Sequence, residues 1–334
     1  MSVIQEQLNL QEESNVVIRA MRPEEAAAVC NCVYSCYGYS YPNRDMYDPA
    51  RVLALNQEQK IVSYVAVDYC GGVIGHAALE LDSANPTVGE MGNAFVLPEH
   101  RGSGLLNEFA DVLVNAAKNR GLAGAFVGSV CSHYYSQKAA HKRGFSDTAL
   151  LLNRLPHMQF RRLHSIVKRR ENILHSFRIF AVDKPLSLYV PPRHRNMVEQ
   201  IYQHLGLTVS WQSAPDSLTT PKGLIRVNAD PYGAVHIFIR QNPGGSTTGL
   251  AEVKPNDQTE VTYLYLNLAE PETPLLCGIY EYRGYFFAGI LPGAGDCNWL
   301  VLQKPRDKCD YTKLEVASAL GQALTDYVKS QEPR

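Results

Sequence analysis

The sequence lacks long apolar runs, an excess of one charge and a dense set of cysteines, and each absence excludes a class of protein. No stretch of the 334 residues approaches ~18 consecutive apolar residues, so no membrane span is expected. Lys and Arg number 32 against 33 Asp and Glu, so the net charge of −1 provides no field that would steer the chain to nucleic acid or to an anionic membrane. Eight cysteines spread over this length do not form a disulfide framework.

The remaining composition is that of a globular protein. Hydrophobic residues make up 45% of the chain and charged residues 19%, and the length is sufficient for two domains. Residues 1–15 are polar and lack the basic and apolar blocks of a signal peptide, so we expect a flexible tail there. We therefore expect a soluble cytoplasmic protein, either a monomer or a homodimer.

A strand, a glycine-rich turn and a helix are predicted in succession between Val88 and Arg120. The turn contains Arg101-Gly102-Ser103-Gly104, and Gly121 is placed to end the helix. Backbone N–H groups at such a helix start have no carbonyl partner inside the helix, and with the helix dipole they form a site for an anion, usually a phosphate. The helix carries one apolar stripe made of Leu105, Phe109, Val112, Leu113 and Ala116.

The glycine pattern is neither of the common nucleotide loops. A P-loop requires GxxxxGK followed by Ser or Thr, and a dinucleotide-binding turn requires GxGxxG; neither is present here. With its flanks, F-V-L-P-E-H-R-G-S-G-L-L resembles the pyrophosphate loop of the GNAT N-acetyltransferase superfamily. Arg101 and Gly104 match that loop, and Val96 and Pro98 match the strand end that precedes it. Leu106 stands where the family prefers Gly or Ala.

The order of predicted elements is similar to that family over residues 16–155. The resemblance implies an α/β (α+β) protein with the GNAT acyl-CoA N-acyltransferase fold, a mixed central sheet flanked by helices. Strand–helix–strand succession predicts a parallel pair with a right-handed crossover. The predicted strands are 16–20, 62–69, 73–81, 88–97, 125–130, 148–154 and 173–182, and the predicted helices are 23–37, 105–120 and 132–143.

The second half of the chain repeats the first weakly. Gly284-Tyr285 parallels Gly144-Phe145, each pair preceded by Arg, and it follows a predicted strand at 261–268 and a predicted helix at 273–283. The glycine-rich segment 242–249 lacks the preceding strand end and arginine, and Pro255 interrupts the place of the long helix. We predict a GNAT domain at 16–183 and a degenerate GNAT-like domain without a coenzyme A loop at 184–334. This tandem resembles two-domain bacterial acetyltransferases.

The resemblance implies acetyl-CoA as cosubstrate and a small-molecule or peptide amine as acceptor. The backbone N–H groups of Phe95 and Val96 would hold the thioester carbonyl and the pantetheine amides, as in the family. No metal is expected. The implied coenzyme A residues are Phe95, Val96, Arg101, Gly102, Ser103, Gly104, Leu105 and Leu106.

Glu90 is the candidate general base, because the family often has a catalytic Glu at about this place in the central strand. A carboxylate in an apolar strand has its pKa raised by desolvation, which suits a base; the alternative is a surface residue at the strand end. Regular alternation would place Glu90, Gly92, Ala94 and Val96 on one face of the strand.

The acid that protonates the leaving thiolate is less clearly marked. The family's usual tyrosine position, four residues before Gly144, holds Ala140. His133 and Tyr135 are the preferred substitutes over Tyr134 and His141. In the second half Tyr280 occupies the matching position, and core packing is its expected role.

Several features leave alternatives open. The tyrosine-rich segment 34–47 is either the edge of a core or a wall of the acceptor pocket. Cys30, Cys32 and Cys36 are expected to be buried reduced thiols rather than metal ligands. The basic run 160–170 is expected to be a solvated linker face rather than a nucleic-acid site. A non-catalytic acyl-CoA sensor or scaffold is the alternative to the enzyme.

Overall fold

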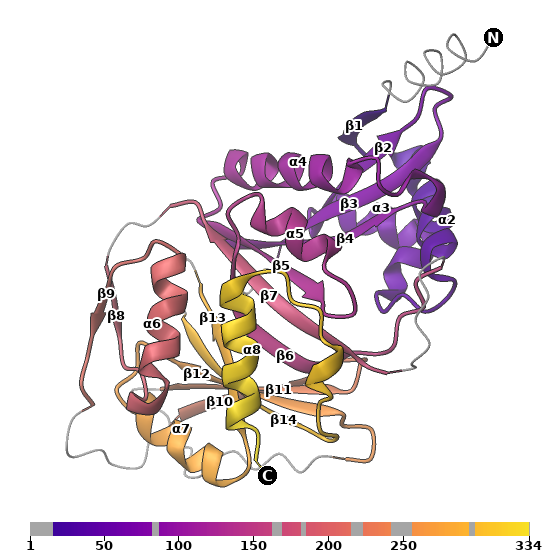
Figure 1. The fold of residues 1–334 in the computed structure, drawn as a ribbon. Helices are drawn as coiled ribbons and strands as arrows, with labels where there is room; N and C mark the ends of the chain where they lie inside the picture. The colour runs from indigo at the N-terminus through magenta and orange to yellow at the C-terminus, as the bar shows by residue number, and fades with distance from the viewer. Residues whose placement is uncertain are drawn as a thin grey trace. The chain divides into compact units, whose positions relative to one another are not determined.

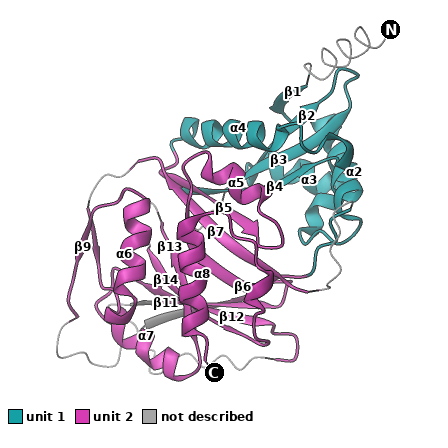
Figure 2. Cartoon of the chain, in the orientation of Figure 1, with its two compact units in different colours: residues 1–121, 157–168 teal, residues 122–156, 169–334 magenta. Residues whose placement is uncertain are grey.

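The computed structural model describes residues 16–81, 87–161, 169–181, 185–214, 223–241, 256–293 and 298–333 (Figure 1). The chain forms two compact units (Figure 2): unit 1 comprises residues 1–121 and 157–168, and unit 2 comprises residues 122–156 and 169–334. The predicted tail at 1–15, the glycine-rich segment 242–249, Pro255 and most of the basic run lie outside the described residues. None of the described helices is both long enough and apolar enough to cross a membrane.

Unit 1 has four antiparallel strands in the order β1-β2-β3-β4. The strands are β1 (Val17–Ala20), β2 (Ile61–Val67), β3 (Val73–Leu81) and β4 (Val88–Val96). The helices are η2 (Pro23–Glu25), α2 (Ala26–Tyr37), η3 (Arg44–Tyr47), α3 (Pro49–Gln57), η4 (Pro98–His100) and α4 (Leu105–Asn119).

Helix α3 is absent from the sequence-based prediction, although its start carries a standard signal. The side chain of Asp48 accepts hydrogen bonds from the backbone N–H groups of Ala50 and Arg51, and Pro49 occupies the first helical position. An Asp N-cap followed by Pro is favoured at a helix start because it satisfies otherwise unpaired N–H groups and fixes φ. The helix was missed because only Val52 is buried, so the apolar period is weak.

Helices α2 and α4 pack on opposite faces of this sheet. Gly75 of β3 leaves room for the ring of Phe109 on α4, since a Cβ there would lie 3.0 Å from that ring. On the other face, Phe95 of β4 and Val65 of β2 join the buried side chains of α2 in one apolar cluster. Of the apolar stripe predicted for α4, Leu105, Phe109, Leu113 and Ala116 are buried and Val112 is half-buried.

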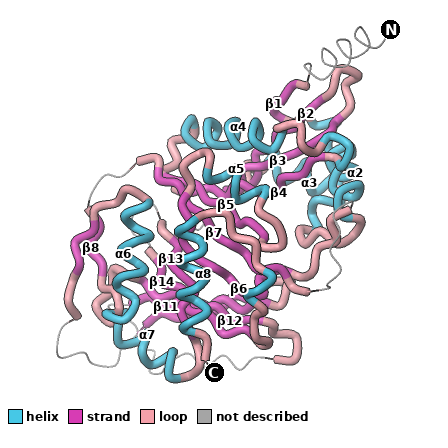
Figure 3. Tube along the Cα trace, in the orientation of Figure 1, coloured by secondary structure: helices cyan, strands magenta, loops and turns pink. Residues whose placement is uncertain are grey.

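Unit 2 contains a mixed sheet in the order β5-β7-β6-β13-β14-β12-β11-β10, and all neighbours are antiparallel except β11 and β12. Helices occur between these strands along the chain (Figure 3). The strands are β5 (Gly124–Val130), β6 (Ser146–Leu155), β7 (Glu171–Ile179), β10 (Gly223–Ala229), β11 (Ala234–Gln241), β12 (Val261–Asn267), β13 (Phe286–Leu291) and β14 (Trp299–Pro305), with β8 (Leu186–Leu188) and β9 (Val209–Trp211) as a separate parallel pair. The helices are α5 (Tyr135–His141), η5 (Pro192–His194), α6 (Arg195–His204), α7 (Thr273–Tyr282), η6 (Tyr311–Lys313) and α8 (Ala319–Gln331).

One arrangement occurs twice within unit 2. In β5-α5-β6-β7 and in β12-α7-β13-β14 the last strand lies between the first two, and β6 pairs with β13. Gly144 and Gly284 end the two helices with positive φ values of 76° and 87°, a conformation that favours glycine. The weak repeat predicted from Arg-Gly-aromatic therefore corresponds to a repeated β-α-β-β element.

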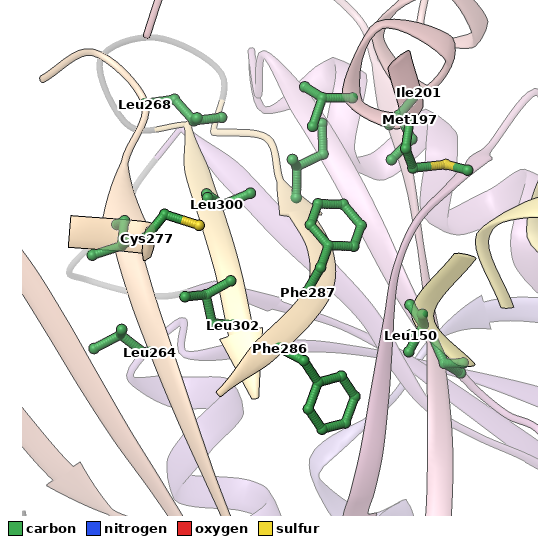
Figure 4. Close-up of a cluster of buried hydrophobic side chains, with 14 of the residues drawn as sticks. Leu150, Met197, Ile201, Leu264, Leu268, Cys277, Phe286, Phe287, Leu300 and Leu302 are labelled. Carbon is green, nitrogen blue, oxygen red and sulfur yellow. The ribbon is translucent and has the colours of Figure 1, made fainter. Parts of the chain in front are cut away.

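The second copy of this element lies in a large apolar core. Side chains of β6, α6, β12, α7, β13 and β14 meet there, including Leu150, Met197, Cys277, Phe287 and Leu302 (Figure 4). Tyr280, which matches Ala140 by position, belongs to the same core with 1% of its surface exposed. Core packing, the role expected for Tyr280, agrees with this burial.

A buried polar network ties η5 to α7 and α8. His194 is fully buried; its Nε2 lies 2.8 Å from Oε1 of Glu281 and its Nδ1 lies 2.8 Å from the hydroxyl of Tyr327. Burial alone would raise the pKa of Glu281, but the hydrogen bond and charge of His194 and the ion pair with Arg193 hold that pKa below its usual value. Glu281 is therefore ionised at neutral pH and depends on these partners.

Replacing His194 with Ala is expected to lower the free energy of unfolding by about 3 kcal/mol, because it leaves the Glu281 carboxylate and the Tyr327 hydroxyl short of a partner in a buried site. Urea denaturation of the full chain measures the effect. The exposed His204 on α6 supplies the control, and His204→Ala is expected to change the free energy by less than about 0.5 kcal/mol. Equal effects of the two substitutions would contradict a structural role for the network.

Candidate functional site

The loop before α4 has the backbone that its two glycines permit. Gly102 and Gly104 have φ values of 85° and 94°, and a Cβ at either position would meet no atom within 4 Å. The Arg101 guanidinium donates to the carbonyl oxygens of Val96 and Arg161, at 3.4 and 2.8 Å. The Ser103 hydroxyl donates to the carbonyl of His100 at 2.7 Å. These contacts hold the loop while both glycines face open space.

The backbone N–H groups of this loop lie at the start of α4, a helix of fifteen residues. Within the part of the chain that the structure describes, no backbone carbonyl accepts from the N–H groups of residues 102–106, whereas Asn107 and Glu108 both donate to Gly104. Unsatisfied donors at a helix start with the positive end of its dipole attract an anion. Residues 101–106, which we call the anion loop, thus present backbone donors of the kind that bind an anion at a helix start.

Strand β4 contains a bulge that the sequence did not predict. Its register against β3 pairs Glu90 with Glu80 and Gly92 with Ala78, then shifts so that Phe95 pairs with His76. Asn93 takes a left-handed φ of 47° at this point. The expected common face of Glu90, Gly92, Ala94 and Val96 is therefore wrong, because the extra residue turns Phe95, and not Val96, toward the face of Glu90.

The bulge gathers a polar cluster on that face. Glu80 and Glu90 lie directly opposite each other on β3 and β4. The amide nitrogen of Asn93 donates to Oε1 of Glu80 at 2.7 Å, and its oxygen accepts from the hydroxyl of Tyr41 at 3.0 Å and from Asn43 at 3.3 Å. Two carboxylates, an amide and a phenol thus meet beside the strand that leads into the anion loop.

The surroundings of Glu80 favour its protonated form. Burial, followed by the neighbouring negative charge of Glu90, raises the pKa of Glu80 to about 8. A half-buried carboxyl group that is protonated at neutral pH is typical of a functional site rather than of a solvated strand end.

The two residues at the end of β4 have distinct surroundings. Phe95 is 3% exposed, and its ring stacks on that of His76 with centroids 5.0 Å apart. The imidazole Nδ1 of His76 donates to the carbonyl of Asn93 at 2.8 Å, and burial lowers the pKa of His76 to about 4, so this ring is neutral. The carbonyl of Val96 accepts from the thiol of Cys36 and from Arg101.

The tyrosine-rich segment is partly packed against the core and partly exposed. Tyr37 packs against Tyr41 with ring centroids 4.9 Å apart, and Tyr41 reaches Asn93 in the polar cluster. Tyr34 and Tyr39 are 41% and 70% exposed. Tyr41 and Asn43 both connect the segment to Glu80 through hydrogen bonds to Asn93.

The three cysteines of α2 lie in its buried face. Cys30, Cys32 and Cys36 are buried, and burial raises the pKa of Cys30 to about 11 and that of Cys32 to about 12. The thiols of Cys32 and Cys36 donate to the carbonyls of Val73 and Val96, each at 3.2 Å. These cysteines are buried protonated thiols, as the sequence predicts.

The candidate acids belong to unit 2. The rings of His133 and Tyr135 lie 5.3 Å apart at the start of α5, where Tyr135 is 55% exposed. His141 is engaged elsewhere, since its Nε2 lies 2.9 Å from the buried carboxylate of Asp147. Ala140 is buried. His133 and Tyr135 therefore form one aromatic pair, whereas Glu90 and the residues of the loop lie in unit 1.

Sequence reasoning missed Glu80, Asn93 and Tyr41. Glu80 had a readable signal, a carboxylate inside an otherwise apolar strand, but its position opposite Glu90 depends on hairpin register. Outside this cluster, the described residues contain one group with metal-ligating side chains, His194, Cys277 and Glu281, which is the buried network of unit 2.

Part of the chain matches a known family. Residues 26–145 match the acetyltransferase (GNAT) family. A search of curated proteins finds no relative. Among solved structures, YncA from Salmonella typhimurium, solved with its cofactor acetyl-CoA, is 20% identical over 51% of this chain and 97% of its own, with a TM-score of 0.41. An N-acetyltransferase from Staphylococcus aureus is 17% identical over 49% of this chain and 98% of its own, with a TM-score of 0.41. Mutant forms of the spermidine/spermine N-acetyltransferase SpeG from Vibrio cholerae are 14% identical over 49% of this chain and 93% of their own, with a TM-score of 0.39.

The family match covers the part of the chain that contains the candidate site. The match spans the strand, the loop and the helix that carry the anion site, together with the polar cluster of β3 and β4. Residues 26–145 of the chain therefore match a GNAT acetyltransferase domain. The family and the mixed α/β fold expected from the loop sequence are confirmed.

Proposed function

We propose that the protein transfers an acetyl group from acetyl-CoA directly to an amine of a small molecule or peptide. The anion loop follows strand β4, which carries one of the two paired carboxylates, and this arrangement supports the function. In the proposed reaction the amine nitrogen forms a bond to the thioester carbon, the carbon–sulfur bond breaks, and the coenzyme A thiolate takes up a proton. Starting from an ammonium ion, one further proton goes to the solvent.

The donor would occupy the loop at the start of α4. The N–H groups of residues 102–106 would bind the pyrophosphate, with the Arg101 side chain holding the loop in place. Leu106 stands where the family prefers Gly or Ala, and its backbone N–H would serve as one of these donors. The backbone of Phe95 and Val96 would bind the pantetheine arm and orient the thioester.

Glu90 would act as the general base and take a proton from the acceptor's ammonium group. Its half-buried position opposite Glu80 supports this role, because a carboxylate in a partly desolvated site is a stronger base than one in water. His133 and Tyr135 are the proposed acids for the leaving thiolate. We further propose that residues 184–334 form a degenerate GNAT-like domain that supports the first domain without binding coenzyme A.

Two measurements on the full chain test the function. Isothermal titration with acetyl-CoA tests the donor site, and release of free thiol over a panel of amines tests the transfer. Binding with turnover is the expected result. Binding without turnover on any amine would favour an acyl-CoA sensor or scaffold, and absence of binding would refute the proposed donor site.

Gly104→Ala is expected to weaken acetyl-CoA binding by about tenfold, because the new Cβ projects into the space that the pyrophosphate would occupy and strains a left-handed residue. Gly121→Ala is the matched control, since Gly121 also has a positive φ of 71° and open space around its Cβ position but lies at the other end of α4. Both variants should lose similar stability, and only Gly104→Ala should lose affinity in the titration. Equal loss of affinity would point to general destabilisation instead.

A further inference from the structure

The two carboxylates of the polar cluster converge over one residue of β4. A Cβ placed on Gly92 would lie 3.1 Å from Oε1 of Glu80 and 3.7 Å from Oε1 of Glu90. Both side chains therefore lean over Gly92, whose lack of a side chain leaves room for their approach. Both residues are half-buried, so each keeps part of its surface exposed to the solvent.

The groups that face Glu80 supply no positive charge. From β4 come Glu90 and the neutral amide of Asn93; from β3 comes His76, which is buried and neutral; and the segment before η3 contributes the Tyr41 hydroxyl by way of Asn93. Arg44 of η3 donates to the carbonyl of Tyr39, and Asp45 pairs with Arg51. Among the described residues, no lysine or arginine forms an ion pair with Glu80.

Two carboxylates that share a site in this way either retain a proton or bind a cation. We propose that Glu80 and Glu90 together bind the acetyl acceptor as an ammonium ion, and that Glu80 makes the enzyme select acceptors that carry additional positive charge. This inference rests on the proposed function, because it assigns a substrate class to the same site. Glu80 acts here as a specificity residue, whereas Glu90 takes the proton of the amine that reacts.

Proton exchange follows from this arrangement. In the free protein at pH 7 Glu80 carries a proton, since burial and the charge of Glu90 raise its pKa to about 8. The arriving ammonium replaces that proton as the positive partner of the pair, so Glu80 ionises and one proton leaves to the solvent. Asn93 continues to donate to Oε1 of Glu80 in both states and keeps the carboxylate in place.

Three acceptors of equal chain length test the preference for charge. The series consists of 1,5-diaminopentane, pentylamine and 5-aminopentanoate, which share one reactive amine and differ in the charge at the far end. We expect kcat/KM to fall by about tenfold at each step in that order. In Glu80→Gln, which keeps an oxygen that can accept from Asn93, the differences should shrink to about threefold or less.

Two controls separate this inference from the proposed function. Glu24→Gln removes the same charge at an exposed position of η2, and its acceptor order should match that of the unmodified protein. Acetyl-CoA affinity should be equal in all three proteins, so a failure of the donor site is seen separately. An order that persists in Glu80→Gln, or a preference for 5-aminopentanoate, would overturn the inference.

A binding measurement completes the test if turnover is slow. Titration of 1,5-diaminopentane at pH 7 in buffers of different ionisation enthalpy reports the protons released on binding. Release of up to about one proton per diamine is expected, and it should be lost in Glu80→Gln. Lack of diamine binding to a protein that binds acetyl-CoA would overturn the inference.

Discussion

Glu90→Gln is expected to lower kcat by about 10²–10⁴-fold, the usual contribution of general-base catalysis. Gln keeps the size and the hydrogen-bonding oxygen of Glu but cannot take a proton from the acceptor's ammonium group. In the proposed site acetyl-CoA would bind through the backbone of a loop that begins eleven residues farther along, so its dissociation constant should change by less than about twofold. Steady-state release of free thiol and titration with acetyl-CoA measure the two quantities.

The same pair of variants also tests the alternative assignment, in which Glu80 is the general base. If Glu80 were the base, Glu80→Gln would abolish turnover on every amine, and Glu90→Gln would change only the acceptor preference. The expected result is the reverse: Glu80→Gln keeps substantial turnover on pentylamine, and Glu90→Gln loses it on all acceptors. Unchanged kcat in Glu90→Gln would exclude Glu90 as the base.

The anion loop was predictable because all of its determinants lie close together in the sequence. Arg101, the two glycines and the apolar stripe of α4 are local signals, and the structure places them as expected. The polar cluster was only half predictable. The alternation rule assigns faces correctly up to Gly92, and it fails at Asn93 because a bulge adds one residue to β4. The position of Glu80 depends on the register of a hairpin, which is set by pairing rather than by composition.

The second half of the chain shows the same limit of sequence-based prediction, for contacts between residues farther apart in the sequence. The strand at 261–267 and the helix at 273–282 have clear patterns and were predicted, and the paired Arg-Gly-aromatic ends revealed the repeat. Strands β10 and β11 and helix α8 were missed. No local pattern could indicate that β6 pairs with β13, since their contact joins residues about 140 positions apart and depends on one glycine.

Gly289→Ala is expected to lower the free energy of unfolding by about 4 kcal/mol or more. Gly289 has a φ of 140° and lies at a bulge in β13, where it is the residue paired with Ala149 of β6. A Cβ on Gly289 would overlap the carbonyl oxygen of Thr148 and lie 2.6 Å from the Cβ of Ala149. Backbone strain and overpacking therefore add at this position, because neither strand can move without breaking the sheet on its other side.

Gly278→Ala provides the matched control for this substitution. Gly278 lies inside α7 with no atom within 4 Å of its Cβ position, so alanine there should stabilise the protein by about 0.5–1 kcal/mol through helix propensity. Urea denaturation of the full chain compares the two variants. If Gly289→Ala cost less than about 1 kcal/mol, β6 and β13 would have to separate easily, and the sheet of unit 2 would behave as two sheets. A loss of about 4 kcal/mol in the free energy of unfolding would instead support one cooperative sheet, in which the two β-α-β-β elements are joined through the pairing of Gly289 with Ala149.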